Sequence, residues 1–331
     1  MDALSDMLRL VKLTGAVYFA ADFSAPWCIS ADDEAAGGAL PKSEHMIFFH
    51  LLTQGSCFAR LPDGESVHFE AGDLIVLPHQ DFHVMGSAPG LAPVPIDAFF
   101  VPPAAGQIAR ASLGGGGEVT RIVCGFLSLD KRLAGPLLDN LPRLIRVRVD
   151  RGEAAAWLAS SVKLTLAEEA SPRAGSGVML AKLSELMFVE ALRNYIEALP
   201  PEQTGWLAGL RDRYVGRALT LLHARPAEPW TVDSLAKEVA LSRSALAQRF
   251  TDLLGTAPMQ YLTRWRLQLA AQMLHSERRG VGAVASDVGY ESEAAFNRAF
   301  KREFGSPPAA WRKAGAGGRR ASSRRRLTSP A

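Results

Sequence analysis

Apolar positions in the last third of the chain follow one pattern twice. In each copy, a short run with helical spacing leads into a tight turn and then a longer run. Apolar residues recur every three or four positions in the longer run, which predicts one buried helical stripe. The copies align 49 positions apart before the turn and 50 after it, so the second copy has one extra turn residue. The aligned pairs are Ala236 and Ala285, Val239 and Val288, Leu246 and Phe296, Phe250 and Phe300, Gly255 and Gly305, Pro258 and Pro308, and Tyr261 and Trp311.

The ends of the longer helices are marked as well. Gly255 and Gly305 stand where a helix commonly ends in a left-handed residue, and a proline follows each of them three positions later. Two helices around a tight turn, with a polar outward face on the second, are typical of the helix-turn-helix motif. Residues 256–276 have one apolar side and predict a single connecting helix. Such a helix would hold two DNA-reading helices one turn of DNA, roughly 34 Å, apart.

Residues 16–130 have a different pattern. Short apolar or alternating runs are separated by Gly, Pro and Asp turns, which is typical of a small antiparallel barrel or sandwich. The glycine run 114–117 is predicted to be a loop tip. The predicted strands are 16–21, 46–52, 57–61, 67–70, 74–78, 96–101 and 120–127.

Helical spacing predicts further helices outside these two regions. They cover residues 1–13, 131–142, 152–170, 177–199 and 206–224, and one more strand covers 143–150. In the first helix, Leu4, Met7, Leu8 and Val11 share one side. The helix at 177–199 has so wide an apolar face that it must be buried, against the barrel or against another subunit. The predicted domains are 1–199, a linker at 200–210, a helical domain at 211–313, and a basic tail at 314–331 expected to be disordered.

Charge separates the two halves of the chain. The formal net charge is +3, but the residues from Thr231 onward hold 17 Lys and Arg against eight Asp and Glu, a net charge of +9 that leaves −6 for the rest. Positive charge is therefore concentrated where the repeats lie and where a polyanion would bind. Three cysteines without CxxC spacing favour a reducing cytosol. No run predicts a signal peptide or a membrane anchor.

The segment from Trp230 to Lys313 resembles the DNA-binding domain of the AraC-type transcription regulators. The resemblance rests on LAKEVALSRSAL (235–246), PMQYLTRWRLQLAAQML (258–274) and DVGYESEAAFNRAFKREFGSPPAAWR (287–312), which occur in the family's order and spacing. It implies that the positions of Ser244, Gln248, Ala294 and Arg298 approach bases. The outward faces of the two recognition helices present Arg243, Ser244, Ala247 and Gln248 on the first, and Glu293, Ala294, Asn297, Arg298, Lys301 and Arg302 on the second.

The side chains on these faces suit different contacts. Gln248 can pair bidentately with adenine, and Arg243 can bind guanine or a phosphate. Glu293 can accept a hydrogen bond from cytosine or serve as a charge at the start of a helix. Tyr261, Trp265 and Trp311 are predicted to be core residues, not stacking platforms for bases.

The sharpest pattern in the first half is AGDLIVLPHQDFHVM (71–85). It resembles the second motif of the cupin barrels, G-x5-P-x-G-x2-H, on Gly72, Pro78 and His83, with Gln80 where the family has glycine. The first cupin motif is degraded, because Phe48 stands at the family's metal-binding glutamate position. The predicted fold is therefore α+β in two domains, an antiparallel cupin-like β-barrel with following helices and an all-α domain of two helix-turn-helix units joined by a linker helix.

Four histidines in this half are candidates for an effector pocket: His45, His50, His79 and His83. Three imidazoles converging inside a barrel could hold a divalent metal ion. Residues 45 and 50 face opposite sides of an unbroken strand, so both could be ligands only across a bulge. We therefore predict no cofactor and no catalytic residue, with a metal ion in the barrel, or histidines that only pack in its core, as the alternatives.

These features predict a cytoplasmic, nucleoid-associated transcription regulator that is not an enzyme. A small-molecule effector would bind the barrel and act on operator binding by population shift. The family resemblance implies activation as the commoner mode, RNA polymerase as a partner and a homodimer through the helix at 177–199. Two alternatives remain: a metal-dependent cupin enzyme that carries a DNA-binding module, and a DNA-binding protein whose barrel serves only for dimerisation.

Overall fold

The structure is a computed structural model that divides into two compact units. It describes residues 2–31, 45–64, 66–99, 109–148, 173–276 and 279–313, with residues 157, 160, 161, 164, 167, 168 and 171. One unit, called the barrel unit here, comprises Lys12–Leu199, and the other, the helical unit, comprises Met1–Val11 with Pro200–Ala331. The predicted tail at 314–331 and most of the predicted helix at 152–170 lie outside the described residues.

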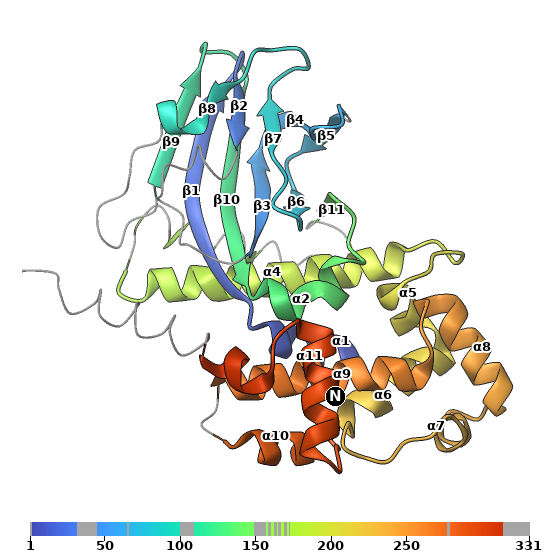
Figure 1. Ribbon diagram of the computed structural model, residues 1–331. Coiled ribbons are helices and arrows are strands. Elements are labelled where there is room, and N and C mark those ends of the chain that lie inside the picture. Colours follow the sequence, from blue (N-terminus) through green and yellow to red (C-terminus); the bar gives the residue numbers. More distant parts are fainter. Residues whose placement is uncertain are drawn as a thin grey trace, which may run out of the picture. The chain divides into compact units, whose positions relative to one another are not determined.

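The barrel unit consists of two sheets that face each other (Figure 1). The six-stranded sheet has the order β11 (Ile145–Arg148), β6 (Asp73–Leu77), β3 (His45–Gln54), β10 (Val119–Leu129), β1 (Thr14–Ser24) and β9 (Ala109–Gly114). The five-stranded sheet has the order β5 (Ser66–Glu70), β4 (Ser56–Arg60), β7 (His83–Gly86), β2 (Cys28–Ala31) and β8 (Val94–Pro95).

Most neighbouring strands are antiparallel, as predicted, but two pairs are not. β9 runs parallel to β1, and β8 runs parallel to β2. The parallel pair at β1 arises because the glycine loop after β9 crosses the end of β1 before β10 begins. The amides of Gly115 and Gly117 donate there to the carbonyls of Ser24 and Ala25, which confirms the glycine run as a loop.

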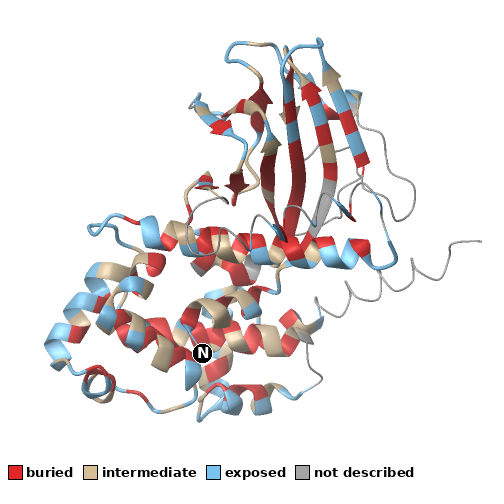
Figure 2. Ribbon diagram, turned by 180° about the vertical axis from the view of Figure 1, so that it is seen from behind, coloured by how far each residue is buried: buried red, intermediate tan, exposed pale blue. Residues whose placement is uncertain are grey.

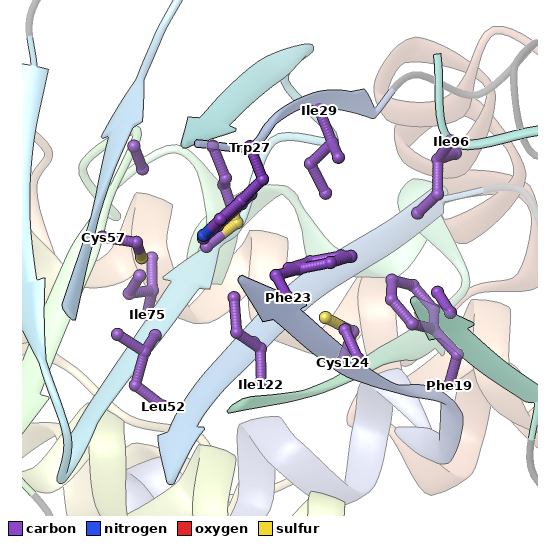
Figure 3. Close-up of a cluster of buried hydrophobic side chains, with 14 of the residues drawn as sticks. Phe19, Phe23, Trp27, Ile29, Leu52, Cys57, Ile75, Ile96, Ile122 and Cys124 are labelled. Atoms are coloured by element: carbon purple, nitrogen blue, oxygen red, sulfur yellow. The ribbon is translucent and has the colours of Figure 1, made fainter. Parts of the chain in front are cut away.

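The core of the barrel unit lies between the two sheets and is rich in aromatic side chains. Phe19, Phe23 and Trp27 form its centre, with the rings of Phe23 and Trp27 4.5 Å apart (Figure 3). Along the edge strand β9, buried and exposed residues alternate (Figure 2), as expected of a strand with one face on a core. Apolar burial of this kind is the main stabilising contribution to a fold.

Helix α4 (Ser176–Ala198) covers the other face of the six-stranded sheet. Its contact with β1 is close, because a Cβ at Gly15 would lie 2.7 Å from the carbonyl oxygen of Ala181. The wide apolar face predicted for this helix is buried within the chain, at Leu180, Leu183, Met187, Phe188, Ala191, Leu192 and Ile196. Helix α2 (Lys131–Leu138) matches the prediction of a short helix after the last long strand.

Other predictions in the barrel unit were wrong. The run at 96–101 was predicted to be a strand, but Ile96–Ala98 form a 3-10 helix, η1, and Ile96 packs in the core. The short strands β2, β7, β8 and β9 were not predicted. β2, β7 and β8 have only two to four residues, too few for a recognisable pattern, so their formation depends on the neighbouring strands. β9 does alternate, but two of its three apolar residues are alanines, which give a weak strand signal.

The helical unit confirms the repeat to the residue. Helices α7 (Val232–Glu238) and α10 (Val281–Asp287) are 49 positions apart, and α8 (Arg243–Leu254) and α11 (Glu293–Phe304) are 50 apart. The connecting helix is α9 (Pro258–Ser276). Tyr261, Trp265 and Trp311 are buried, as predicted.

Helix α1 (Ala3–Val11) packs within the helical unit, on α6 (Arg213–Ala224) and α9. The predicted division placed residues 1–199 together, whereas the compact units group the first eleven residues with residues 200–331. The buried face also differs from the predicted one. It consists of Ala3, Met7, Leu10 and Val11, and Leu4 and Leu8 are only half-buried.

The predicted helix at 206–224 is broken into two. Helix α5 (Trp206–Arg211) ends before Asp212, which takes an extended conformation and caps α6 by accepting hydrogen bonds from the amides of Tyr214 and Val215. The predicted linker at 200–210 therefore contains most of a helix. Trp206 at its start is buried, and its indole N–H donates to the hydroxyl of Tyr261 at 2.8 Å.

Candidate functional site

The two longer helices of the repeat begin and end in the same way. The hydroxyl oxygens of Ser242 and Ser292 accept hydrogen bonds from the amides of the third residues of α8 and α11. Gly255 and Gly305 close the same helices in the left-handed conformation, with φ of 68° and 71°. Local signals of the sequence thus place two equivalent helices in the helical unit.

All ten predicted contact residues lie on α8 and α11 and are exposed or half-exposed. The exposed ones are Arg243, Ser244, Gln248, Glu293, Ala294, Arg298, Lys301 and Arg302, and the half-exposed ones are Ala247 and Asn297. The apolar residues of the same helices point the other way, with Leu246, Phe250, Phe296 and Phe300 fully buried. The two helices therefore present polar faces to the solvent.

Some of these side chains already have partners within the protein. The amide of Gln248 donates to Asp252 at 2.7 Å, and Arg243 pairs with Asp233 at 3.3 Å on the surface. Glu293 lies in the first turn of α11, and its carboxylate occupies the space over Gly282 of α10. That placement suits a negative charge at the start of a helix, the second of its two predicted roles.

A series of hydrogen bonds between buried side chains supports the buried side of the first helix-turn-helix unit. The indole of Trp206 donates to the hydroxyl of Tyr261, which in turn lies 2.6 Å from Nε2 of His223. Because Tyr261 accepts from Trp206, its own proton is available to Nε2 of His223, while the buried Nδ1 of His223 has no hydrogen-bond partner among the described residues. The ring of His223 also stacks on Trp265 at 3.7 Å, and burial lowers the pKa of His223 to about 3. These hydrogen bonds and the ring stacking hold α5, α6 and α9 together.

In the barrel, two of the four candidate histidines meet. Nε2 of His50 and Nε2 of His83 are 2.8 Å apart, Nδ1 of His83 lies 3.0 Å from the carbonyl of Asp81, and Nδ1 of His50 lies 3.0 Å from Sγ of Cys124. A carbonyl can only accept, so His83 donates from Nδ1 and accepts at Nε2. His50 consequently donates to His83, and the Cys124 thiol donates to His50. Burial lowers the pKa of both imidazoles, which keeps this chain neutral.

The other two candidate histidines do not join this pair. Nε2 of His45 donates to the carbonyl of Pro78 at 2.7 Å, and Nε2 of His79 donates to the carbonyl of Leu141 at 3.0 Å. Strand β3 pairs regularly with β10 from His45 to His50, so these two residues face opposite sides, as their odd separation predicts. Of the four candidate pocket residues, only His50 and His83 therefore lie together.

The residues present do not fit a resident metal ion of the cupin kind. The two Nε2 atoms bond to each other, and the sulfur of Cys124 lies at the opposite nitrogen of His50, so it cannot complete a shared site. Among the described residues, no group of three or more His, Cys, Asp and Glu side chains is arranged to hold a metal ion. Phe48 stands at the position of the family's glutamate, and its ring lies 6.3 Å from that of His83.

Two further residues of the barrel core were missed by the sequence analysis. Cys124 extends the histidine chain, and the buried indole N–H of Trp27 has no hydrogen-bond partner among the described residues. An unpaired buried donor costs about 1–3 kcal/mol. No sequence signal marks either residue, because both depend on which strands face each other. In the part of the chain that the structure describes, no helix is long and apolar enough to cross a membrane.

Comparisons with known proteins agree with this division of the chain. A family model described as a cupin matches residues 2–197, and one described as a helix-turn-helix domain matches residues 235–314. An AraC-like transcription regulator of Streptomyces lividans is 34% identical over 318 residues, which cover 95% of this chain and 98% of that protein. The activator RclR of Escherichia coli, named as specific for RCS, is 30% identical over 314 residues, 95% of this chain and 98% of that protein. The regulator AlkR of Acinetobacter baylyi is 27% identical over 317 residues, 95% of this chain and 99% of that protein.

Proposed function

Because the chain belongs to the family of AraC-like transcription regulators, we propose that α8 and α11 read two successive stretches of the major groove on one face of an operator. The observation that carries the proposal is the equivalence of the two helices. Both begin at a serine cap, end at a left-handed glycine and expose a polar face, and α9 joins them within one compact unit. The two half-sites are then one turn of DNA, roughly 34 Å, apart.

Within these faces, Gln248 and Arg298 are the proposed base readers. Gln248 can form two hydrogen bonds with adenine and Arg298 two with guanine, each pair worth about 1–3 kcal/mol of discrimination. Gln248 must first leave its bond with Asp252, whereas Arg298 has no ion-pair partner among the described residues. Arg243, Lys301 and the other charged residues at the edges of the helices would bind phosphates.

Operator selection from random duplex DNA at fixed salt tests the proposal. Wild type should enrich a motif of two short half-sites one helical turn apart. Gln248→Ala should relax base preference in one half-site only, and Arg298→Ala in the other, at a cost of about 1–3 kcal/mol each. The matched control is Arg193→Ala, which removes an exposed arginine from the barrel unit and should leave the motif unchanged. A motif that neither substitution alters would refute the assignment of these two residues.

We further propose that the barrel senses a small molecule near His50, His83 and Trp27. The unpaired indole N–H of Trp27 faces the core, so a ligand that brings a hydrogen-bond acceptor to it would remove the cost of leaving it unpaired. The neutral histidine pair on the same core offers polar groups that can rearrange around a ligand. The barrel then contributes binding, and no catalytic step is assigned to it.

A thermal-shift screen with small molecules that carry carbonyl or carboxylate groups checks the sensing proposal. A compound that raises the melting temperature of wild type, and much less that of Trp27→Phe, would support it. A compound that stabilises both proteins equally binds elsewhere and would argue against this site. Phenylalanine keeps the aromatic packing while it removes the donor, which makes this variant the appropriate comparison.

Two covalent connections can carry the signal from the barrel unit to the helical unit. Residues 12 and 13 lead from α1, which packs in the helical unit, directly into β1 of the barrel, and the second connection is at Leu199 and Pro200. An effector that moves β1 would therefore act on the packing of α1. The effector can change the free energy of operator binding by no more than the difference between its own binding free energies for the two conformations of the protein, one that binds the operator well and one that binds it poorly.

The proposed partners besides operator DNA are RNA polymerase and a second copy of the chain. Val178, Met179 and Leu186 of α4 expose 69%, 41% and 49% of their surface, which favours a homodimer through this helix. Leu186→Glu should abolish a dimer in sedimentation experiments, and Lys182→Glu on the same helix should not. A wild type that sediments as a monomer at every concentration would contradict this. Regulation of transcription implies action in the cytoplasm, at the nucleoid.

A further inference from the structure

A close backbone contact joins the turn of the second helix-turn-helix unit to the segment between α6 and α7. Gly289, in the turn between α10 and α11, has a φ of 85°, and a Cβ at this position would lie 2.7 Å from Cα of Ala227 and 2.8 Å from its carbonyl oxygen. The equivalent residue of the first unit, Ala240, has a φ of 57° in the same kind of turn. A left-handed residue here therefore tolerates a side chain, and it is the neighbouring segment at Ala227 that requires glycine at 289.

Arg266, in the middle of α9, bonds to both sides of this contact. Its Nε donates to the carbonyl of Pro226 at 2.7 Å, one Nη donates to Glu228 at 2.8 Å, and the other Nη donates to Gly289 at 3.2 Å. The guanidinium is half-buried, which lowers its pKa, and its three acceptors described above are all backbone carbonyls. The guanidinium reaches the carbonyls of both segments from three nitrogens held in one rigid plane, whereas the three donors of a lysine ammonium sit on a single atom at the end of a flexible stem and would hold the same carbonyls less firmly.

The two segments that Arg266 binds lead directly into the two helix-turn-helix units. Glu228 precedes by three residues Thr231, the cap of α7, and Gly289 precedes by three residues Ser292, the cap of α11. Helix α9 connects the two helix-turn-helix units (Figure 1), and α8, α10 and α11 pack on it. The bonds of Arg266 oppose rotation of one unit relative to the other, because they tie the entry of each unit to the same side chain.

We propose that Arg266 is a positioning residue that fixes α8 and α11 relative to each other and thereby sets the half-site spacing that the protein accepts. The inference rests on the proposed function, namely that both helices read one operator. One base pair of extra spacing moves and rotates a half-site along the DNA, so a rigid pair of helices must lose contacts at every spacing but one. A pair that can turn would accept several spacings.

The test measures affinity at fixed salt for duplexes that carry the two selected half-sites at centre-to-centre spacings from about 8 to 13 base pairs. Wild type should prefer one spacing over its neighbours by at least about fivefold, the value of one base contact. Arg266→Met should reduce this preference to less than about twofold at the neighbouring spacings while binding is retained, because the lost clamp costs selectivity and not contacts. Arg266→Lys should behave like the methionine variant.

The matched control is Arg264→Met, which removes an exposed arginine from the same helix and should keep the wild-type spacing profile. If Arg266→Met lowers affinity by the same factor at every spacing, Arg266 only supports the fold and the proposal is overturned.

If circular dichroism shows that Arg266→Met is unfolded, the spacing profiles of Arg266→Lys and Gly289→Ala decide between the two outcomes. Gly289→Ala pushes the two segments apart and should shift or flatten the profile, and a wild-type profile in both variants would overturn the proposal. If wild type itself selects no two-part motif, the proposed function fails first and this inference fails with it.

Discussion

The packing of α1 in the helical unit can be tested at Leu10. This side chain is 2% exposed and lies on the face of α1 that packs on α6 and α9. Leu10→Ala removes three carbon atoms from a filled site, and alanine is at least as good a helix former as leucine, so helix propensity does not account for a loss. Substitutions of a buried leucine by alanine cost about 2–5 kcal/mol, depending on how far the site can collapse.

Urea unfolding followed by tryptophan fluorescence is the assay, because four of the six tryptophans lie in the helical unit: Trp206, Trp230, Trp265 and Trp311. All four are buried, so the emission follows mainly this unit. With a urea m value of about 2 kcal/mol per molar, the loss corresponds to a fall of about 1–2.5 M in the midpoint. Arg9→Ala is the control, since its side chain is 61% exposed on the same helix.

Two results would refute the reasoning. If the midpoint of Leu10→Ala stays within about 0.2 M of the wild-type value, α1 contributes no packing to the unit that the fluorescence reports. If Leu10→Ala and Arg9→Ala lower the midpoint equally, the loss comes from the helix itself and not from its buried face. In either case, the coupling of the barrel to the helical unit through α1 would lose its support.

Three further predictions concern buried titratable groups. Burial lowers the pKa of His223 from 6.5 to about 3, so the folded state favours the neutral imidazole. The free energy of unfolding of the helical unit should therefore be highest above pH 6.5 and fall by about 1.4 kcal/mol per pH unit below it. Urea midpoints measured between pH 4 and 7 check this. The lowered pKa values of His50 and His83 act in the same direction, so amide hydrogen exchange of β3 and β7, corrected for intrinsic rates, should be faster at pH 5 than at pH 7. Burial raises the pKa of Cys57 to about 12, so at pH 8 iodoacetamide should modify this thiol at least about a thousandfold more slowly in the native protein than in urea, and equal rates would contradict its burial.

The helical unit could be predicted closely because its signals are local. A serine cap, a left-handed glycine and apolar residues at helical spacing each act within one or two turns, so α8 and α11 end where the sequence predicts. The break at Asp212 was missed although its signal is also local. Asp212 is a good cap residue, but the apolar spacing continues across it and suggested one helix.

Contacts between distant parts of the chain could not be predicted in this way. The amphipathic pattern of α1 predicts that one face is buried but does not identify what buries it. The directions of His45 and His79 depend on strand register and on backbone carbonyls, which have no signature in the sequence. The bonds of Arg266 are of the same kind, because a backbone carbonyl that accepts a hydrogen bond is present at every residue and leaves no mark in the sequence.

The cupin motif combines a particular backbone path with a set of metal ligands, and the turn before β7 keeps the path without the ligands. Gln80 stands where the family has glycine, and it still adopts the left-handed conformation, with a φ of 60°. Its side-chain oxygen accepts a hydrogen bond from the amide of Met46 at 3.2 Å, and a bond of this kind, worth about 1 kcal/mol, offsets much of the cost of the conformation. The backbone path of the motif is thus kept by a different residue, while Phe48 and the mutual bond of His50 and His83 remove the ligand set that the path would serve. Among the described residues, the barrel therefore keeps the backbone path of the motif without a group of three side chains placed to hold a metal ion.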